Sequence, residues 1–332
     1  MHRPRAVVTN RAFTQTLDLL SPHCDLHANH GDEPWPRPEL LRRAADAHGL
    51  LAFMPDCIDE AFLEHCAGLK VIACALKGYD NFDIAACTRR GIWVSIVPDL
   101  LTEPTAELAV GLAIGLGRHV AGSDRRAREG TFAGWRPTFY GRSLDGSCVA
   151  IIGAGRVGRA IARKLAGFDC ELLMVDASSS APAPSNARYA ELAEALSRAQ
   201  FVFLAVPLDA GTLHMVDAAW LTSLRPGALL VNPARGSVVV ESAIADALRD
   251  GQLGGYAADV FECEDWARAD RPEGIEPRLL AMPQQTLFTT HIGSAVREVR
   301  AAIEYDAAVN LLEGLRGERP HGAINDPVRR RP

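Results

Sequence analysis

The chain has 332 residues, of which 48% are hydrophobic and 23% charged, and its formal net charge is −6. This is the composition and length of a globular protein with two ordinary domains, and it excludes a disordered, collagen-like or membrane-embedded chain. Acidic residues outnumber basic ones, 41 to 35, so no overall positive field favours nucleic acid or an anionic membrane, and we expect a small-molecule partner.

Targeting segments, disulfides and metal sites are not indicated by the sequence. The first residues are basic but are not followed by the apolar run that a signal peptide needs. The longest apolar stretch, near residues 106–116, is too short and too often interrupted by glycine to span a bilayer. The cysteines lie singly, without a C-x-x-C pair, so we predict no disulfide framework and no bound metal. The three observations together predict a cytoplasmic protein with no membrane partner.

The first hundred residues alternate short β-rich runs with amphipathic helical segments. Predicted strands cover residues 6–9, 49–54, 70–75 and 93–96. Predicted helices cover residues 13–20, 40–48 and 60–66. This alternation predicts a parallel sheet that is covered by helices on both faces.

A second α/β alternation follows a helix at about 105–119, which is apolar around most of its circumference and is therefore predicted to be buried. Its strands are expected at 148–152, near Leu172, and at 201–206, 228–232, 255–260 and 287–290. The chain then ends in one long predicted helix at about 296–315, followed by a basic tail. No internal repeat or long linker interrupts this order.

A G-x-G-x-x-G motif formed by Gly153, Gly155 and Gly158 stands directly after an apolar strand and directly before a predicted helix at 159–166. The first glycine permits the tight turn, the second lets the backbone approach a pyrophosphate, and the third lets helix pack on strand. The helix N-terminus then offers N–H donors to the phosphates. This strand-turn-helix context predicts a dinucleotide site.

Asp176 lies 18 residues after Gly158, at the end of the next predicted strand, close to the spacing of a ribose-binding acid. Its carboxylate would accept bonds from both ribose hydroxyls and would repel a 2′-phosphate. Ala177, which follows, offers no positive charge to such a phosphate, so the sequence favours NAD over NADP. The alternative is an acid at a strand end that is simply solvated.

Three later segments place a reactive side chain just after a strand: Arg235, Glu264 and His291. Ligands bind beyond the carboxyl ends of the strands in open α/β sheets, so these side chains are expected to converge. Arg235 offers a rigid fork for an anion, His291 can take or give a proton, and Glu264 can fix the tautomer of the imidazole and raise its pKa. Taken singly, they are equally typical of a turn-capping arginine, a packed histidine and a solvated glutamate.

These residues, in this order, resemble the D-isomer-specific 2-hydroxyacid dehydrogenase family over nearly the whole chain. In that family, residues of the Arg235, Glu264 and His291 type form the catalytic trio. The resemblance implies a Rossmann-type, doubly wound parallel sheet at residues 101–294 that binds NAD. This domain is inserted into a smaller, flavodoxin-like α/β substrate domain made of residues 1–100 and 295–332. It also implies a homodimer formed through the region that holds the helix beginning near Thr105.

Within the family, the segments 52–56, 74–83, 97–102, 254–262, 264–272 and 291–297 resemble the phosphite (phosphonate) dehydrogenases more closely. Lys77 occupies an anion-binding loop, Asp265 and Trp266 replace the usual proline after the glutamate, and Arg300 adds a base beyond the histidine motif. This resemblance implies oxidation of phosphite to phosphate. Water would attack phosphorus, with His291 as the leading base, while hydride passes to the nicotinamide of NAD.

The resemblance also carries further site positions onto this sequence. For the substrate these are Met54, Lys77, Gly78, Asp80, Trp135, Tyr140, Ser294 and Arg300. For the cofactor they are Lys77, Thr105, Gly153, Gly155, Arg156, Val157, Gly158, Asp176, Pro207, Pro233, Ala234, Asp259 and Gly293. Ordinary core packing is the alternative for Met54, Trp135 and Tyr140.

Two other functions remain open from the sequence. One is an NAD-dependent D-2-hydroxyacid dehydrogenase of the glyoxylate/hydroxypyruvate reductase type. The other is an NAD-sensing binding protein, similar to the transcriptional corepressors that resemble this family. Turnover separates the enzymes from the binding protein, and the substrate that is turned over separates the two enzymes.

Overall fold

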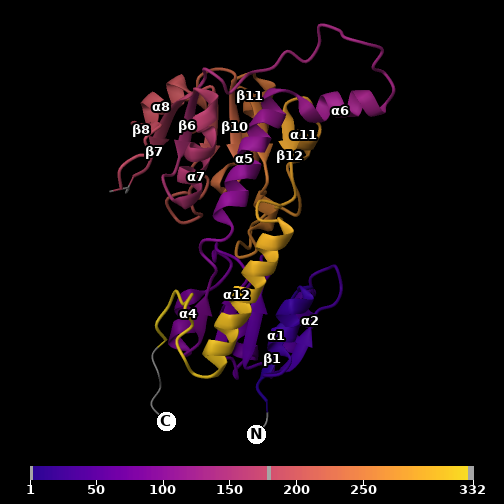
Figure 1. The fold of residues 1–332 in the computed structure, drawn as a ribbon, viewed down its shortest axis with the longest axis vertical. Helices are drawn as coiled ribbons and strands as arrows, with labels where there is room; N and C mark the ends of the chain where they lie inside the picture. The colour runs from indigo at the N-terminus through magenta and orange to yellow at the C-terminus, as the bar shows by residue number, and fades with distance from the viewer. Residues whose placement is uncertain (1–2, 178–180, 328–332) are drawn as a thin grey trace. The chain divides into compact units, whose positions relative to one another are not determined.

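The computed structural model describes residues 3–177 and 181–327, and the chain divides into two compact units (Figure 1). One unit comprises Met1–Leu101, Trp266–Ala269 and Ala295–Pro332, and the other comprises Thr102–Asp265 and Asp270–Ser294. The short stretch Trp266–Ala269 therefore belongs with the first unit, although the predicted boundaries place it in the second. Residues 328–332, at the end of the predicted substrate domain, lie outside the described residues.

The first unit is built on a five-stranded, wholly parallel sheet in the order β2-β1-β3-β4-β5. Its strands are β1 (Arg5–Val8), β2 (Asp25–Ala28), β3 (Gly49–Ala52), β4 (Val71–Cys74) and β5 (Trp93–Ser95). Its helices are α1 (Thr14–Leu20), α2 (Arg37–Ala44), α3 (Glu60–His65), α4 (Ile84–Arg89) and α12 (Arg297–Leu315). This strand order is that of flavodoxin, as predicted for the smaller domain.

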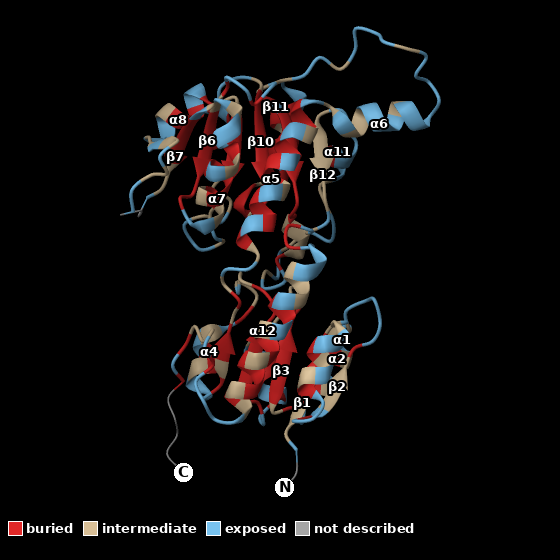
Figure 2. Ribbon diagram, in the orientation of Figure 1, coloured by how far each residue is buried: buried red, intermediate tan, exposed pale blue. Residues whose placement is uncertain are grey.

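Both faces of this sheet are covered, which is why β3 and β4 are buried along their whole length (Figure 2). On one face, side chains such as Leu40, Phe62 and Ala86 bring α2, α3 and α4 into one hydrophobic cluster. On the other face, Leu20 of α1 and Leu311 of α12 belong to a second cluster. Helix α12 thus contributes to the core of the first unit from the far end of the sequence.

The second unit holds a seven-stranded parallel sheet in the order β12-β11-β10-β9-β6-β7-β8. Its strands are β6 (Cys148–Ile152), β7 (Glu171–Val175), β8 (Ala187–Tyr189), β9 (Phe201–Leu204), β10 (Ala228–Asn232), β11 (Leu253–Ala258) and β12 (Thr286–Phe288). Its helices are α5 (Thr102–Gly117), α6 (Val120–Arg128), α7 (Arg156–Lys164), α8 (Leu192–Arg198), α9 (Ala218–Thr222), α10 (Glu241–Arg249) and α11 (Pro277–Leu280). Short 3-10 helices are η1 (Leu165–Phe168), η2 (Gly236–Val238) and η3 (Glu262–Glu264).

This second sheet is doubly wound. Helices α5 and α7 pack on one face through residues such as Ala109 and Ile161, whereas α8, α9 and α10 cover the other through residues such as Leu196, Trp220 and Ile244. The strand order reverses between β6 and β9, and such a reversal is where α/β sheets bind their ligands. The predicted fold class is therefore confirmed.

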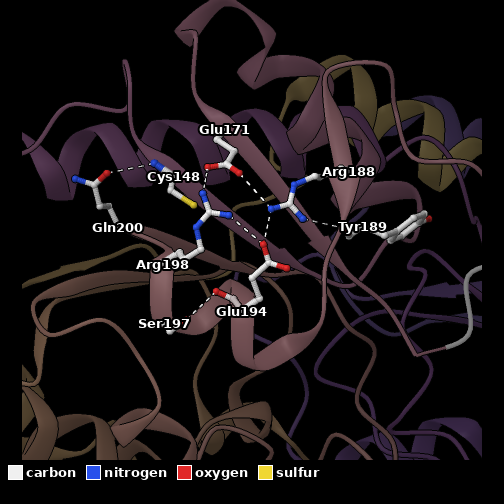
Figure 3. A network of polar contacts seen from close by, with 8 residues as sticks. All are labelled: Cys148, Glu171, Arg188, Tyr189, Glu194, Ser197, Arg198 and Gln200. Atoms are coloured by element: carbon white, nitrogen blue, oxygen red, sulfur yellow. Dashed lines mark hydrogen bonds and ion pairs between the residues drawn. The ribbon is translucent and has the colours of Figure 1, made fainter.

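Strand β8 lies at the edge of this sheet and is held by four charged side chains (Figure 3). Glu171 of β7 and Glu194 of α8 each contact both Arg188 of β8 and Arg198 of α8; the Arg188–Glu171 contact is 3.3 Å and the Arg198–Glu194 contact 3.0 Å. A network of this kind orders an edge more effectively than one exposed pair. It fixes a strand that has only three residues.

Elements that the sequence did not indicate include β2, β8 and α4. Strand β2 is polar and only partly buried, so it lacks the apolar alternation by which strands are recognised. Helix α7 begins at Arg156, three residues before the predicted start, because the turn closes immediately after Gly155. Within the described residues, none of the helices has the length and apolar character needed to cross a bilayer.

Candidate active site in the second unit

The glycine-rich turn between β6 and α7 has the geometry that its sequence predicts. Gly153 adopts a φ of +106°, and a Cβ at this position would lie 2.5 Å from the carbonyl oxygen of Ala205. A Cβ at Gly158 would lie 2.0 Å from the carbonyl oxygen of Gly153, whereas one at Gly155 would meet nothing within 4 Å. Gly153 is therefore required by the turn and Gly158 by the close packing of helix on strand. Gly155 leaves open space where a pyrophosphate would approach.

Asp176 follows the last residue of β7 and reaches back to this turn. Its Oδ2 accepts a hydrogen bond of 2.7 Å from the backbone N–H of Ala154. The backbone of Gly153 donates to the carbonyl of Val175, so two bonds join the end of β7 to the glycine-rich turn. The acid expected to bind the ribose is thus held beside the segment expected to bind the phosphates.

Arg235 stands between β10 and η2 in a loop with little freedom. The side chain of Asn232 accepts from the N–H of Ala234 at 3.1 Å and donates to the carbonyl of Arg235 at 2.9 Å. A Cβ at Gly236 would lie only 1.9 Å from the backbone carbonyl carbon of Phe261, so only glycine fits there. The Arg235 loop is consequently held against the chain that leads to Glu264.

Glu264 and His291 form a direct contact, 2.6 Å between Oε2 and Nδ1. The other carboxylate oxygen, Oε1, accepts from the N–H of Phe261 at 2.7 Å, which fixes the glutamate from its own loop. Nδ1 is therefore taken by the glutamate, and Nε2 is the ring nitrogen that remains for a substrate. Both side chains are about 30% exposed, 28% for His291 and 30% for Glu264, so the pair is accessible to a small molecule.

The loop that carries His291 is organised by the buried carboxylate of Asp259. This carboxylate accepts from the Thr289 hydroxyl at 2.6 Å and from the N–H groups of Ile292 and Gly293, each at 2.8 Å. His291 itself adopts a φ of +56°, a conformation that non-glycine residues seldom take. Three accepted bonds hold this strained loop, and strain of this kind is typical of functional sites.

The other cofactor positions lie in the same unit. Arg156 and Val157 open α7, Pro207 follows β9, and Pro233 and Ala234 follow β10. Thr105, in α5, lies beside Gly293, because a Cβ at that glycine would stand 3.3 Å from its hydroxyl oxygen. These residues could hold NAD, whose phosphates and ribose suit the open glycine turn and Asp176. Their roles remain predictions.

Several residues predicted to bind substrate lie in the first unit, which holds the predicted substrate domain. Lys77, Gly78 and Asp80 follow β4, and Met54 follows β3 and packs against the core cluster there. Arg300, in α12, is largely buried and donates to the carbonyl of Ala75 at 3.1 Å, and its Nη2 lies 3.7 Å from Glu304. Burial lowers the pKa of Arg300. In the structure, then, Arg300 contacts the backbone that leads into the Lys77 loop.

Trp135 and Tyr140 are predicted to line the substrate pocket, but the chain does not bury them. They lie between α6 and β6 and are 77% and 78% exposed. Ser294, by contrast, is buried within the second unit. Their role in a substrate pocket stays a prediction.

Sequence reasoning missed two side chains that position the site. Asn232 holds the Arg235 loop, as described above, and the buried carboxylate of Asp265 accepts from the N–H of Ser237 at 2.9 Å. A proline at position 265 would lack this carboxylate. The presence of aspartate in place of the usual proline could have suggested such a bond.

Together, the glycine turn, Asp176 and the Glu264–His291 pair on a doubly wound sheet define an NAD-dependent oxidoreductase. A family model described as the NAD-binding domain of D-isomer specific 2-hydroxyacid dehydrogenases matches residues 110–293. The chain belongs to the D-isomer specific 2-hydroxyacid dehydrogenase family. The matched residues lie within the segment 101–294 that the sequence predicts to bind NAD.

Named relatives agree with this assignment. A glyoxylate reductase of Pyrococcus furiosus is 34% identical and covers 98% of this chain and 96% of its own. Seven further relatives, 30% to 33% identical, carry the same name. A Thermus thermophilus protein of known structure is similar at a TM-score of 0.86 and 33% identity, covering 97% of this chain and 100% of its own. An NADPH-dependent glyoxylate/hydroxypyruvate reductase of Sinorhizobium meliloti is similar at 0.82 and 25%, covering 99% and 100%.

These comparisons contradict the prediction that the protein oxidises phosphite. The relatives are named as reductases of glyoxylate or hydroxypyruvate, and none of these is a phosphite dehydrogenase. The physical reason is that Lys77 and Arg235 indicate an anion but do not distinguish phosphite from a carboxylate. Asp265, the other departure from the general pattern, has a structural partner in Ser237. The comparisons favour the alternative, a 2-hydroxyacid dehydrogenase of the glyoxylate/hydroxypyruvate reductase type.

Proposed function

We propose that the protein reduces a small 2-oxoacid, glyoxylate or hydroxypyruvate, to the corresponding 2-hydroxyacid with NADH, and catalyses the reverse oxidation with NAD. The observation that carries this proposal is the 2.6 Å contact between Glu264 and His291. It is supported by the relatives named as glyoxylate reductases. A histidine oriented by a carboxylate is the group that a carbonyl reduction requires, because the carbonyl oxygen must gain a proton when its carbon gains a hydride.

NADH supplies the hydride when it is bound. The chain's own residues then have three tasks. Nε2 of His291 gives its proton to the oxygen of the substrate carbonyl, and Glu264 stabilises the charge on the imidazole through Nδ1. Arg235 binds the substrate carboxylate through its planar fork and keeps the carbonyl in reach of the histidine. In the reverse direction His291 takes the hydroxyl proton.

The loop after β4 is assigned the second contact to the anion. Lys77 offers three donors on a flexible stem, and Gly78 leaves room for a small substrate to approach the backbone. A contact from Lys77 to the substrate carboxylate would exist before and during the reaction.

We also propose that the active form is a homodimer. Phe132, Trp135 and Tyr140, which lie close together in the sequence, are 63%, 77% and 78% exposed, and exposed aromatic side chains are enriched at protein interfaces. Light scattering of the purified protein measures this directly. A monomer at working concentration would contradict it.

The function is tested by incubating the purified protein with NADH and, in separate reactions, glyoxylate, hydroxypyruvate and pyruvate. NADH consumption and the hydroxyacid product are both measured. His291→Ala is the matched control, because it removes the proposed acid but leaves the dinucleotide turn intact. A parallel reaction with NAD and phosphite is included.

We expect turnover of one or more 2-oxoacids that is abolished in His291→Ala, and no phosphate from phosphite. Oxidation of phosphite without reduction of any 2-oxoacid would overturn the proposal. NAD binding without turnover of any of these compounds would point to a binding protein instead.

A further inference from the structure

Arg159, in the first turn of α7, joins two segments that are distant in the sequence. Its Nε donates to the carbonyl of Ala154 at 2.9 Å, inside the glycine-rich turn. Its Nη1 donates to the carbonyl of Pro182 at 2.7 Å and its Nη2 to that of Ala181 at 3.2 Å. One rigid guanidinium therefore bonds both the dinucleotide turn and the segment that follows Asp176.

Tyr189 of β8 completes this arrangement. Its hydroxyl accepts from Nη2 of Arg159 at 2.9 Å and donates to the carbonyl of Ala181, also at 2.9 Å. Arg188, the preceding residue, belongs to the charged network that holds β8, and Figure 3 shows the ring of Tyr189 directed away from that network. The network thus fixes the strand from which Tyr189 reaches Arg159.

The position of Arg159 relates it to the cofactor. Ala154 accepts from Arg159 through its carbonyl, and its N–H donates to Asp176. Arg159 and Asp176 therefore both bond the backbone of Ala154. Further along the same connection, Asn186 donates to the carbonyl of Ala162 at 2.7 Å. The connection between β7 and β8 is therefore attached to α7 at residues 181–182 and again at residue 186.

We propose that Arg159 is a positioning residue for NAD: by holding residues 181–182 next to the glycine-rich turn, with Tyr189 as its partner, it sets the affinity of the site for the adenosine end of the cofactor. The inference concerns the cofactor domain and does not depend on which substrate is reduced. A preorganised segment binds more tightly because less freedom is lost on binding.

Helix α7 provides a matched control. Arg163 lies one turn further along the same helix and pairs with Glu103 of α5, so its guanidinium is directed to a different element from that of Arg159. Arg159→Gln and Arg163→Gln therefore make the same chemical change on the same helix. Tyr189→Phe removes only the hydroxyl group and keeps the aromatic ring, which packs against the hydrophobic core.

The dissociation constant of NAD is measured by titration calorimetry, independently of catalysis. We expect about tenfold weaker binding in Arg159→Gln, about threefold in Tyr189→Phe, and wild-type binding in Arg163→Gln, with kcat at saturating NADH unchanged in all three. The double variant is expected to bind no more weakly than Arg159→Gln, because both changes break the same arrangement. Amide hydrogen exchange at residues 181–186 is expected to be faster in Arg159→Gln and Tyr189→Phe than in the wild type.

Two results would overturn the proposal. One is an NAD affinity in Arg159→Gln and Tyr189→Phe equal to that of the wild type. The other is equal weakening in Arg159→Gln and Arg163→Gln, which would indicate a general effect of charge on α7. If Arg159→Gln does not fold, Tyr189→Phe decides alone: wild-type affinity and wild-type hydrogen exchange in that variant contradict the assignment.

Discussion

Replacing Glu264 by glutamine tests the proton-transfer pair with the smallest change of shape. The two carboxylate oxygens of Glu264 accept from different donors, Nδ1–H of His291 at 2.6 Å and the N–H of Phe261 at 2.7 Å. A glutamine side chain has only one oxygen, so it can satisfy one of these donors and must point its NH₂ group at the other. Either orientation damages the site.

If the amide oxygen faces Phe261, its NH₂ group faces Nδ1 of His291 and favours the tautomer without a proton there. The positively charged imidazole that donates the proton is then opposed by another donor. If the amide oxygen faces His291, the N–H of Phe261 loses its acceptor, and the bond to His291 is no longer assisted by charge.

The size of the effect follows from these losses. A missing acceptor at Phe261 costs the same in the ground state and the transition state, so it lowers stability and not kcat. The barrier rises through the lost stabilisation of the charged imidazole, and a hydrogen bond to a charged group is worth about 1.5–3 kcal/mol. About 2.7 kcal/mol in the barrier corresponds to roughly 10²-fold in rate. We therefore expect kcat for glyoxylate reduction to fall about 10²-fold, with the KM for NADH unchanged.

The assay is steady-state NADH consumption with glyoxylate at varied concentrations of both substrates. Glu313→Gln is the control, because Glu313 also contacts a histidine, Nδ1 of His321 at 3.0 Å, but does so in the first unit. It is expected to lower the Tm and leave kcat unchanged. A kcat for Glu264→Gln within about threefold of wild type would refute the assigned role of the pair.

Three further changes test other parts of the site. Asp176→Ala combined with Ala177→Arg should shift the ratio of kcat/KM values toward NADP, because a negative charge is removed and a partner for the 2′-phosphate is added; an unchanged ratio means that Asp176 does not contact the ribose. Lys77→Ala should raise the KM for the 2-oxoacid about tenfold with a smaller change in kcat, since its contact exists before and during reaction; an equal fall in kcat and kcat/KM would assign it to the transition state alone. Burial raises the pKa of Asp56 from 3.8 to about 6, so ionisation of this group opposes folding as the pH rises from about 4 to about 6. Asp56→Asn should therefore gain Tm relative to wild type across that interval and keep the gain above it, and a Tm difference independent of pH would contradict this.

The dinucleotide turn was predictable because local geometry leaves no choice. Gly153 has a positive φ, and Gly153 and Gly158 each face a backbone carbonyl at a distance that no Cβ permits. The sequence must therefore show glycine at these positions in any protein with this turn. The contact between Glu264 and His291 was predictable for a related reason, because each follows a strand of one parallel sheet and the ends of such strands share an edge. Arg235 also follows a strand of this sheet, and its role stays a prediction.

Other features depend on contacts that no sequence pattern reveals. Strand β8 has three residues, and charged side chains from β7 and α8 hold it in place. Asn232 and Asp265 hold the backbone of the Arg235 loop, and the departure at position 265 does not by itself identify the N–H of Ser237 as the partner. The substrate was predicted wrongly because cationic residues report the charge of a ligand and not the atom at its centre.

The acidic run from Asp259 to Asp265 shows how the site is built. Loops at the end of a sheet have few backbone partners of their own, so their N–H groups need other acceptors. Each acid in the run supplies one: Asp259 to Ile292 and Gly293, Glu262 to Glu241, Glu264 to Phe261, and Asp265 to Ser237. Among the described residues, Glu264 is the one of these four acids that contacts the imidazole ring of His291. A carboxylate, which serves elsewhere in the run as a backbone acceptor, therefore takes part in the proposed chemistry at this position. Glu264 is thus one of a set of carboxylates that hold three loops in fixed positions. The geometry of its contact with His291 depends on the loops that the other carboxylates hold.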